Sequence, residues 1–434
     1  MPAPYAKESA QKSVAPAKAG AQEINFLNKS QNLKHSPDPR IRGRAPAAYS
    51  LRVEAGVGAI ACKTSCVGAR HASPVANSGP ASSWRYTLGS FFAMDKAMHP
   101  PAFALTAYLV LLTGIASADG LKILGERLFH DKRLSADGSI SCASCHIPDK
   151  AFTDGLPLAK GINGQLGTRN TPSLINVKTV RPLFWDGRRD TLEAQAKDPF
   201  VNPREHGFTQ PAQVADLVRS APIYTAAFQK SFSISPEAIS IDHIAQALAE
   251  FERTLVAYDS PAERYLYRGD KNALTESARR GLALFRGRAR CSSCHLIGET
   301  QAPLTDNAFH SLGIGYKKIE PRLAEITTRL ANSRGKPLDH SVISDQEISE
   351  LGRFVVTLNP TDIAKFRTPS LHNVALTAPY MHDGSVTTLE EVVELELYYR
   401  GAETGRPLAL TLPEREDLLA FLRALNTNLM FQSP

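Results

Sequence analysis

Cysteine, tryptophan and methionine are scarce in this chain, whose 434 residues contain 6, 2 and 5 of them. Strand-like alternation of polar and apolar residues is also scarce, which argues against a sheet as the main architecture. The basic excess is confined to the N-terminal part of the chain. Residues 1–118 hold 13 basic and 5 acidic side chains, whereas residues 119–434 hold 37 basic and 38 acidic ones. Because residues 119–434 carry no excess of basic over acidic side chains, no nucleic-acid partner is expected.

Long apolar runs are lacking too. The run from Phe103 to Ile115 is too short to span a bilayer, which leaves a signal peptide or a buried helix as explanations. The weakly basic Met94-Asp95-Lys96 precedes the run and the small-residue pattern Ala116-Ser117-Ala118 follows it, with Asp119 next. This order favours a signal peptide over residues 94–118. We therefore expect export to the periplasm and no membrane span after cleavage.

Residues 1–93 stand in front of that predicted signal peptide. They are rich in Ala, Ser, Pro and Lys, and their Cys62 and Cys66 match no site pattern. A signal peptide belongs at the N-terminus, so translation is expected to start at Met94 or Met98. Residues 1–93 are then an artefact of the gene model or a disordered extension.

The rest of the chain predicts a mainly α fold with long loops. Ile241 to Tyr258 has apolar residues at three- and four-residue intervals, and Thr411-Leu412-Pro413 begins a closing helix that ends near Leu425. Similar segments ending in Leu-Phe, at Leu128-Phe129 and Leu284-Phe285, suggest two related domains. The predicted domains cover residues 119–265 and 266–434.

Four of the cysteines form two pairs, each followed at once by a histidine. Cys142-Ala143-Ser144-Cys145-His146 and Cys291-Ser292-Ser293-Cys294-His295 both fit C-x-x-C-H. Two thiols one helical turn apart can each add to a vinyl group of one haem, and the histidine then reaches the iron as proximal ligand. The sequence therefore predicts two covalently bound c-type haems, one enclosed by each domain.

Structural zinc and disulfides are the alternatives. A four-cysteine zinc site has its pairs much closer together than these, and zinc would not require a histidine after each pair. Disulfides form outside the cytoplasm, but a bridge across two residues is usually a redox motif. Neither alternative explains both histidines.

Further motifs sharpen the prediction. They closely resemble those of the bacterial di-haem cytochrome c peroxidase/MauG superfamily, in order and in spacing, from about Leu124 to Leu425. They are Thr168-Arg169-Asn170-Thr171-Pro172-Ser173-Leu174, Phe184-Trp185-Asp186-Gly187-Arg188, Asn202-Pro203-Arg204-Glu205, Arg367-Thr368-Pro369-Ser370-Leu371 and Ala378-Pro379-Tyr380-Met381-His382-Asp383-Gly384.

The resemblance implies roles for particular residues. Hydrogen peroxide would react at the haem bound by His146, where Glu205 matches the acidic residue that moves protons during O–O cleavage. Trp185 matches the tryptophan between the two haems, as a route for electrons. Asn170, with the carbonyl oxygens of Thr377 and Pro379, matches a calcium site, for which hard oxygen ligands are suited.

Two departures from the family pattern concern the iron ligands. Many members close the first haem with a second histidine, but Ile162 occupies that position, so the first haem is predicted to be open; His206 is a weaker candidate ligand. Methionine usually closes the second haem, but the corresponding helix, residues 389–401, contains none. MauG-like members use tyrosine, which suggests Tyr398, with Tyr399 and Met381 as alternatives. Oxygen ligation favours higher oxidation states of iron.

Together these features predict a periplasmic, MauG-like di-haem oxidoreductase that passes oxidising equivalents to a protein substrate or a donor such as a cytochrome c or copper protein. MauG also uses a surface tryptophan, for which this chain has Ala289. A conventional peroxidase that reduces peroxide to water therefore remains an alternative, as does a non-catalytic two-haem electron carrier.

Overall fold

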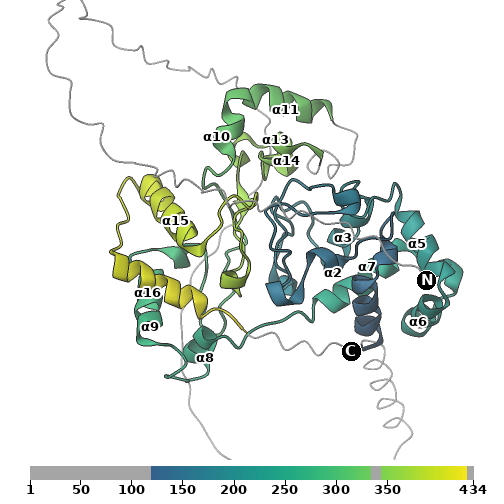
Figure 1. Cartoon of the computed structure of the whole chain (residues 1–434), viewed down its shortest axis with the longest axis horizontal. Helices are drawn as coiled ribbons and strands as arrows, with labels where there is room; N and C mark the ends of the chain where they lie inside the picture. The colour runs from purple at the N-terminus through teal and green to yellow at the C-terminus, as the bar shows by residue number, and fades with distance from the viewer. Residues whose placement is uncertain (1–118, 334–343, 428–434) are drawn as a thin grey trace, which may run out of the picture. The chain divides into compact units, whose positions relative to one another are not determined.

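The computed structural model describes residues 119–333 and 344–427, which belong to one unit beginning at Asp95. The predicted extension, the signal peptide and Met430 lie outside the described residues. The described part is mainly helical with long loops, which confirms the predicted fold class (Figure 1). None of its helices is long and apolar enough to cross a membrane.

The first half has its core between a leading helix at residues 119–130 and α7 (Ile241–Glu252). Leu128, Phe129 and Leu248 are almost completely buried there. Burying one such side chain contributes about 1.5–3 kcal/mol, so this stripe accounts for much of the local stability. The other α-helices of this half are α2 (Cys142–Cys145), α3 (Leu192–Gln195), α4 (Asp198–Val201), α5 (Pro211–Ser220) and α6 (Pro222–Phe232).

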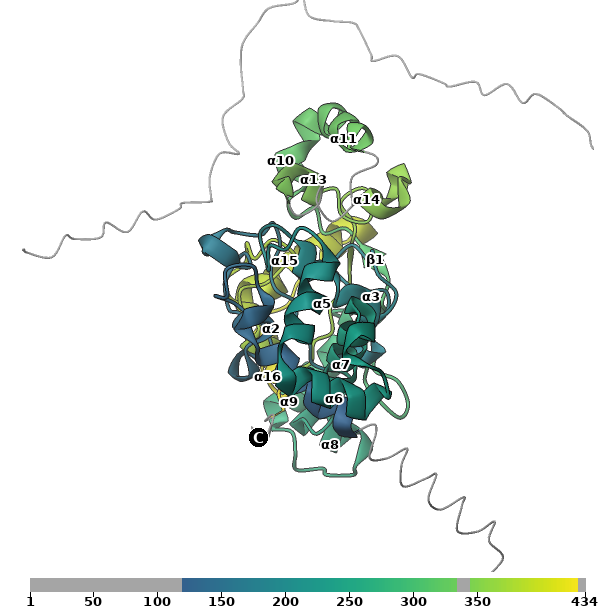
Figure 2. The same ribbon diagram turned by 90° about the vertical axis from the view of Figure 1, so that its right-hand side faces the viewer.

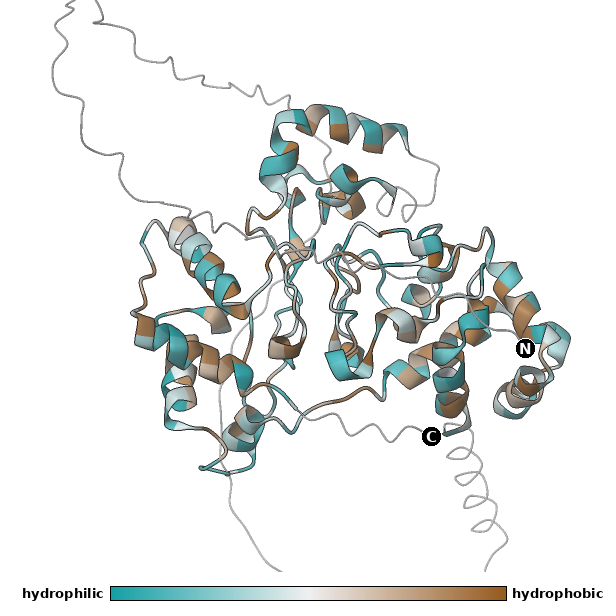
Figure 3. Cartoon of the chain, viewed as in Figure 1, coloured by the Kyte–Doolittle hydropathy of each residue, from teal (hydrophilic) through white to brown (hydrophobic). Residues whose placement is uncertain are grey.

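The second half has the same arrangement, with its core between α9 (Glu276–Arg286) and α16 (Leu412–Arg423). Thr411 caps α16, as its Thr-Leu-Pro start predicts, by accepting a hydrogen bond from the Glu414 N–H. The remaining large helices of this half are α8 (Pro261–Tyr267) and α15 (Leu389–Thr404). Figure 3 shows polar and apolar residues sharing these helices, as expected for helices with one buried face.

One glycine in each half sets the crossing of its two main helices. A Cβ on Gly125 would lie 1.9 Å from the carbonyl oxygen of Ala247, and one on Gly281 would lie 1.9 Å from that of Asp417. Phe129 packs on Phe251 with ring centroids 5.0 Å apart, and Phe285 packs on Phe421 at 5.1 Å. These matched contacts show that the two halves are built on one scheme.

A third, smaller core was not expected from the sequence. It contains Ile319, Ile326, Leu330, Ile348, Leu351 and Val355. These residues come from a helical insertion that Figures 1 and 2 show beside the two halves. Its helices are α10 (Tyr316–Ile319), α11 (Leu323–Asn332), α13 (Gln346–Ser349) and α14 (Phe354–Thr357).

Extended structure is limited to one short antiparallel pair in the described residues. β1 (Phe309–His310) pairs with β2 (Phe366–Arg367), with Phe309 opposite Arg367. Short 3-10 turns fill the loops: η1 (Lys132–Leu134), η2 (Pro148–Lys150), η3 (Ile162–Gly164), η4 (Val177–Thr179), η5 (Pro236–Ala238), η6 (Cys291–Ser293), η7 (Glu320–Arg322), η8 (Pro360–Asp362) and η9 (Val374–Leu376). In the sequence the first core ends at Ala257 and the second begins at Ala262, and the predicted domain boundary at residue 265 remains a prediction.

Candidate functional site

Both cysteine-histidine motifs open into one cavity of about 340 Å³. Most residues that the sequence singles out line it, although they come from loops and helices far apart in the chain. These are Cys142, Cys145, His146, Asn170, Trp185, Glu205, Cys294, His295, Thr377, Pro379 and Met381. Cys291 packs against the second core, beside the cavity.

In the first motif α2 carries both cysteines and His146 follows its last residue. Ser141 and Ser144 form a capping box that holds the start of this turn. His146 Nδ1–H donates to the carbonyl of Phe152 at 2.9 Å. Burial lowers the pKa of His146, which keeps the imidazole neutral. The histidine thus has a fixed tautomer with Nε2 available as a ligand.

The second motif has the same arrangement. The turn η6 holds Cys291, and His295 Nδ1–H donates to the carbonyl of Leu304 at 2.9 Å. Burial lowers the pKa of His295, and the nearby carboxylate of Glu396 partly opposes this effect. Two neutral, oriented imidazoles, each behind a pair of thiols, form the donor set that two c-type haems require.

The four thiols are free, with no disulfide among the described residues. Burial raises the pKa of Cys145 and of Cys291 to about 12, so these thiols are neutral. Cys142 packs against the first core and Cys291 against the second, so the two cysteine pairs do not come together as one four-cysteine zinc site.

Two ionisable side chains are buried in the cavity wall. Arg367 is buried and, within the described residues, forms no ion pair; burial alone lowers its pKa to about 10. Glu252 is buried with no hydrogen-bond partner for its Oε2 in the described part of the chain. Burying such groups alone is unfavourable, and haem propionates would give Arg367 the anion it lacks.

Glu205 lies in the wall of the first haem cavity. The side-chain amide of Asn202 donates to Glu205 Oε1, and the carboxylate raises the pKa of the Cys145 thiol, so it lies near the attachment site. His206 is buried beside it, with Nδ1–H donating to the carbonyl of Leu134 at 2.5 Å. Ile162 is buried against this loop, where its N–H donates to the carbonyl of Glu205.

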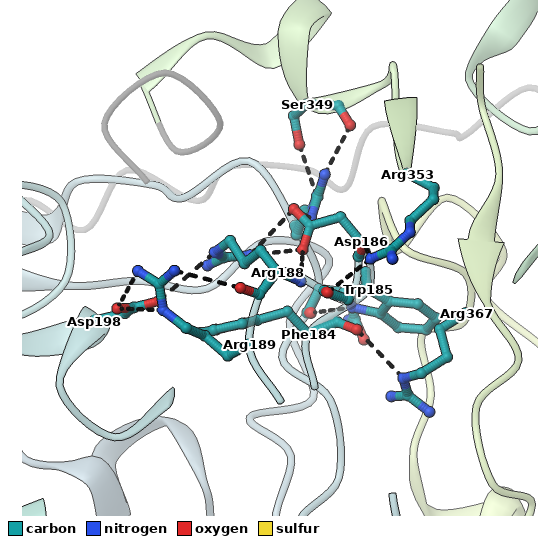
Figure 4. Close-up of polar contacts among 12 residues, drawn as sticks. Phe184, Trp185, Asp186, Arg188, Arg189, Asp198, Ser349, Arg353 and Arg367 are labelled. Carbon is teal, nitrogen blue, oxygen red and sulfur yellow. Dashed lines mark hydrogen bonds and ion pairs between the residues drawn. The ribbon is translucent and has the colours of Figure 1, made fainter. Parts of the chain in front are cut away.

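Trp185 connects the two halves. Its indole N–H donates to the carbonyl of Asn170 at 2.9 Å, and its own carbonyl accepts the N–H of Arg367 at 2.8 Å. Figure 4 shows Trp185 between Phe184 and Arg367, whose side chain donates to the Phe184 carbonyl. Trp185 is therefore held by both motifs that carry Thr-Pro-Ser-Leu: its indole by Asn170 of the first and its backbone by Arg367 of the second.

Asp186, next to Trp185, is the centre of a buried charge network (Figure 4). It pairs with Arg169 at 2.7 Å and with Arg188 at 3.2 Å. Burial alone would raise the pKa of Asp186, but these two guanidinium groups outweigh it and hold the pKa at about 2. Arg353 donates to the carbonyls of Asp186 and Gly187, which ties the insertion to this network.

The predicted calcium ligands share the cavity. Asn170 is buried; its N–H donates to the carbonyl of His382 and its side-chain amide donates to the carbonyl of Leu156. Thr377 and Pro379 line the same cavity. The structure brings these segments together, and a calcium ion between them remains a prediction.

The structure contradicts the prediction that Tyr398 binds the second iron. Its side chain is 68% exposed, and Tyr399 packs near Gly313 outside the cavity lining. The residues of α15 that line the cavity are Val392, Glu396 and Arg400. Because 3.6 residues make one helical turn, residues 392, 396 and 400 form one stripe, and Tyr398 lies on a different face.

Several residues of this site were missed in the sequence. Glu252 stands one turn after Leu248 on the apolar face of α7, and an acid on such a face is a readable signal. Glu396 likewise stands one turn after Val392. The pairing of Asp186 with Arg169 has no local signal, because it depends on how two loops meet.

The family model described as di-haem cytochrome c peroxidase matches residues 121–272. The chain is 35% identical to cytochrome-c peroxidase IdrP1 of Pseudomonas sp. (strain SCT), over 77% of this chain and 88% of the relative. It is 32% identical to methylamine utilization protein MauG of Methylorubrum extorquens, over 87% of this chain and 93% of the relative. The chain belongs to the di-haem cytochrome c peroxidase and MauG family.

A solved structure supports the same assignment. A MauG-like protein associated with microbial copper homeostasis matches with a TM-score of 0.57 at 32% identity, covering 71% of this chain and 89% of that one. The protein is thus a di-haem oxidoreductase of the peroxidase type, with cytochrome c-like helical domains. Membership of this family implies two haem groups.

Proposed function

We propose that this protein is a periplasmic, MauG-like oxidoreductase in which hydrogen peroxide reacts at the haem held by Cys142, Cys145 and His146. The observation that carries this proposal is the position of Glu205, which lines the same cavity as Cys145 and His146 and lies near the Cys145 thiol. Ile162 stands where many members of the family have a coordinating histidine, which supports an open iron. When bound, the haem supplies an iron that binds peroxide and accepts its oxidising equivalents.

Glu205 carries the proton transfer. Peroxide must lose a proton from one oxygen and gain one on the leaving oxygen, and a carboxylate in the cavity wall can do both. Asn202 orients the carboxylate through its bond to Oε1. The buried Arg367 would hold a haem propionate, and its backbone N–H also holds Trp185.

Trp185 provides the connection toward the haem held by His295. The indole lies in the cavity wall with its N–H fixed on the Asn170 carbonyl. Electrons would cross here from the second half, which receives them from a protein substrate or a small redox protein. Ala289, where MauG has its exit tryptophan, is buried at 2% exposure. This favours a docked donor, such as a cytochrome c or a copper protein, over long-range oxidation of a partner.

Export, covalent attachment and calcium complete the proposal. The signal peptide over residues 94–118 delivers the chain to the periplasm, where haem is attached to the four cysteines. A Ca²⁺ ion held by Asn170 Oδ1 and the carbonyl oxygens of Thr377 and Pro379 would fix the loops between the halves.

The test of the acid–base role is Glu205→Gln. Glutamine keeps an oxygen that can accept from Asn202 but cannot carry the proton, so peroxide turnover should fall by about 10²–10⁴-fold. Glu237→Gln, at an exposed glutamate of the same half, is the matched control and should keep full turnover. Unchanged turnover in Glu205→Gln would refute the role.

An electron carrier without catalysis is the alternative from another class. A carrier needs six ligands on each iron to keep reorganisation small, and it would bind neither cyanide nor carbon monoxide. The proposed enzyme should bind cyanide in the ferric state and carbon monoxide in the ferrous state. Absence of both in a spectroscopic titration would overturn the proposal in favour of the carrier.

A further inference from the structure

Because Tyr398 is exposed, another residue of α15 must be considered as a ligand of the second haem iron. Leu389, Val393 and Leu397 are buried in the second core, and they fix the rotation of the helix about its axis. With this rotation Val392, Glu396 and Arg400 line the cavity. Glu396 is the only side chain of the three that can offer an anionic oxygen ligand.

Glu396 lies close to the proximal histidine of the second motif. Both side chains line the cavity, and Arg400, which pairs with Glu396, contacts Cys294, the residue before His295. His295 is anchored through Nδ1 to the carbonyl of Leu304, so Nε2 is the nitrogen left for iron. A ligand on the other side of that iron must come from the cavity wall.

Arg400 positions this carboxylate. Its Nε lies 3.5 Å from Glu396 Oε2, and its NH2 group lies 3.2 Å from the Sγ of Cys294. The Glu396 side chain is 27% exposed, so most of it is shielded from solvent. The pair thus places an anionic oxygen beside the haem attachment cysteine.

We propose that Glu396 supplies the sixth ligand of the second haem iron, with Arg400 as its positioning residue. The proposal rests on the second c-type haem of the proposed function and names a ligand in place of the methionine or tyrosine used elsewhere in the family. A carboxylate is a hard anionic donor, which stabilises Fe(III) relative to Fe(II). The second haem would therefore have a low reduction potential and a weak ligand field.

Met381 is the competing side chain, since it also lines the cavity. Its backbone has φ of 72°, and its carbonyl accepts the Gly384 N–H, which places it in a tight turn before His382. A thioether would give the opposite properties: a low-spin ferric haem with a sulfur-to-iron charge-transfer band and a higher potential. The two ligands are therefore distinguishable in the resting protein without peroxide.

The experiment is electron paramagnetic resonance and visible spectroscopy of the purified diferric protein and four variants, each first shown to carry two haems. The parent should show high-spin ferric signals from both haems and no sulfur charge-transfer band. Glu396→Met should convert one haem to low spin, create that band and raise the potential of that haem. Glu396→Gln should alter the same high-spin signal, whereas Tyr398→Phe and Met381→Leu should leave the spectra unchanged.

Two results would overturn the proposal. One is a second-haem signal that neither Glu396 variant changes. The other is a sulfur charge-transfer band in the parent that Met381→Leu abolishes. Because these spectra are recorded without peroxide, either failure is separate from a failure of the peroxidase proposal, which the Glu205→Gln turnover decides.

Discussion

At the residue scale, Trp185 is held unusually firmly for a tryptophan in a loop. Its indole N–H, its carbonyl and the carboxylate of the next residue, Asp186, all have partners within 3.2 Å. Such anchoring keeps the ring in one orientation, which electron transfer between two fixed cofactors requires.

We therefore expect Trp185→Phe to separate the reactions of the two haems. Phenylalanine keeps an aromatic ring but loses the donor to the Asn170 carbonyl and the readily oxidised indole. After one equivalent of peroxide, loss of the ferric signal of the second haem should slow by at least about tenfold, a barrier increase of about 1.4 kcal/mol. Stopped-flow spectroscopy measures this rate.

Tyr267→Phe, which changes an aromatic residue beside the second core, is the control for this experiment and should react at the parent rate. If Trp185→Phe loses the second ferric signal as fast as the parent, electrons cross by another route and the assigned role is wrong.

The ligands of the second iron could be predicted only in part from the sequence. The spacing in C-x-x-C-H brings two cysteine thiols and one histidine imidazole together locally. In the structure these groups line the cavity or its edge. The sixth ligand depends on how α15 is rotated, and a sequence pattern cannot fix a rotation to within one residue. Because Leu389, Val393 and Leu397 form the buried face of this helix, Tyr398 faces the solvent.

At the element scale, α7 combines a strong apolar face with one buried acid. The sequence predicted this helix from Ile241 to Tyr258, and the structure ends it at Glu252. Loop residues that follow still pack into the core, as Leu255 does, which is why the apolar pattern extends beyond the helix. Periodicity thus identified the element correctly and overestimated its length.

Glu252 on α7 leads to a prediction about stability. Burial raises the pKa of Glu252 to about 8, well above its value of 4.5 in an unfolded chain. The native state therefore holds a proton that the unfolded state has lost between these pH values, so stability falls as pH rises through this window. Glutamine does not ionise, so Glu252→Gln should not lose stability as the pH rises. It should be more stable than the parent at pH 8, by on the order of 3 kcal/mol.

Urea unfolding of both proteins at pH 5 and at pH 8 measures the effect. The free energies of unfolding should nearly agree at pH 5 and diverge at pH 8. A constant difference at both pH values would show that Glu252 is ionised in the folded protein, and the predicted dependence would then be wrong.

At the scale of the whole described molecule, function depends on how the two haem-binding halves and the insertion are held together. The three cores are separate, and polar contacts near Asp186 join the first half to the insertion. Arg169 links Asp186 to Ser349, while Arg353 reaches the carbonyls beside it. The contacts with the insertion could not be predicted from the sequence, because Arg169 and Ser349 are 180 positions apart and Asp186 and Arg353 are 167 positions apart.

Asp186 is therefore expected to control the stability of this junction. Replacing it by asparagine leaves the buried Arg169 and Arg188 without their shared anion, which typically costs about 3–5 kcal/mol. Asp186→Asn should show this loss at pH 7 in urea unfolding. Asp216→Asn, which removes a surface pair with Arg219, should change stability little and is the control.

The pH dependence of the loss identifies its cause. The pKa of Asp186 is about 2 in the folded protein and 3.8 in an unfolded chain, so its contribution is fully present above pH 3.8 and disappears as pH falls through 2. The difference between parent and Asp186→Asn should therefore shrink by about 2 kcal/mol from pH 5 to pH 2. A difference that stays constant over this range would mean that asparagine disrupts packing rather than charge, and that the junction is not held by the Asp186 carboxylate.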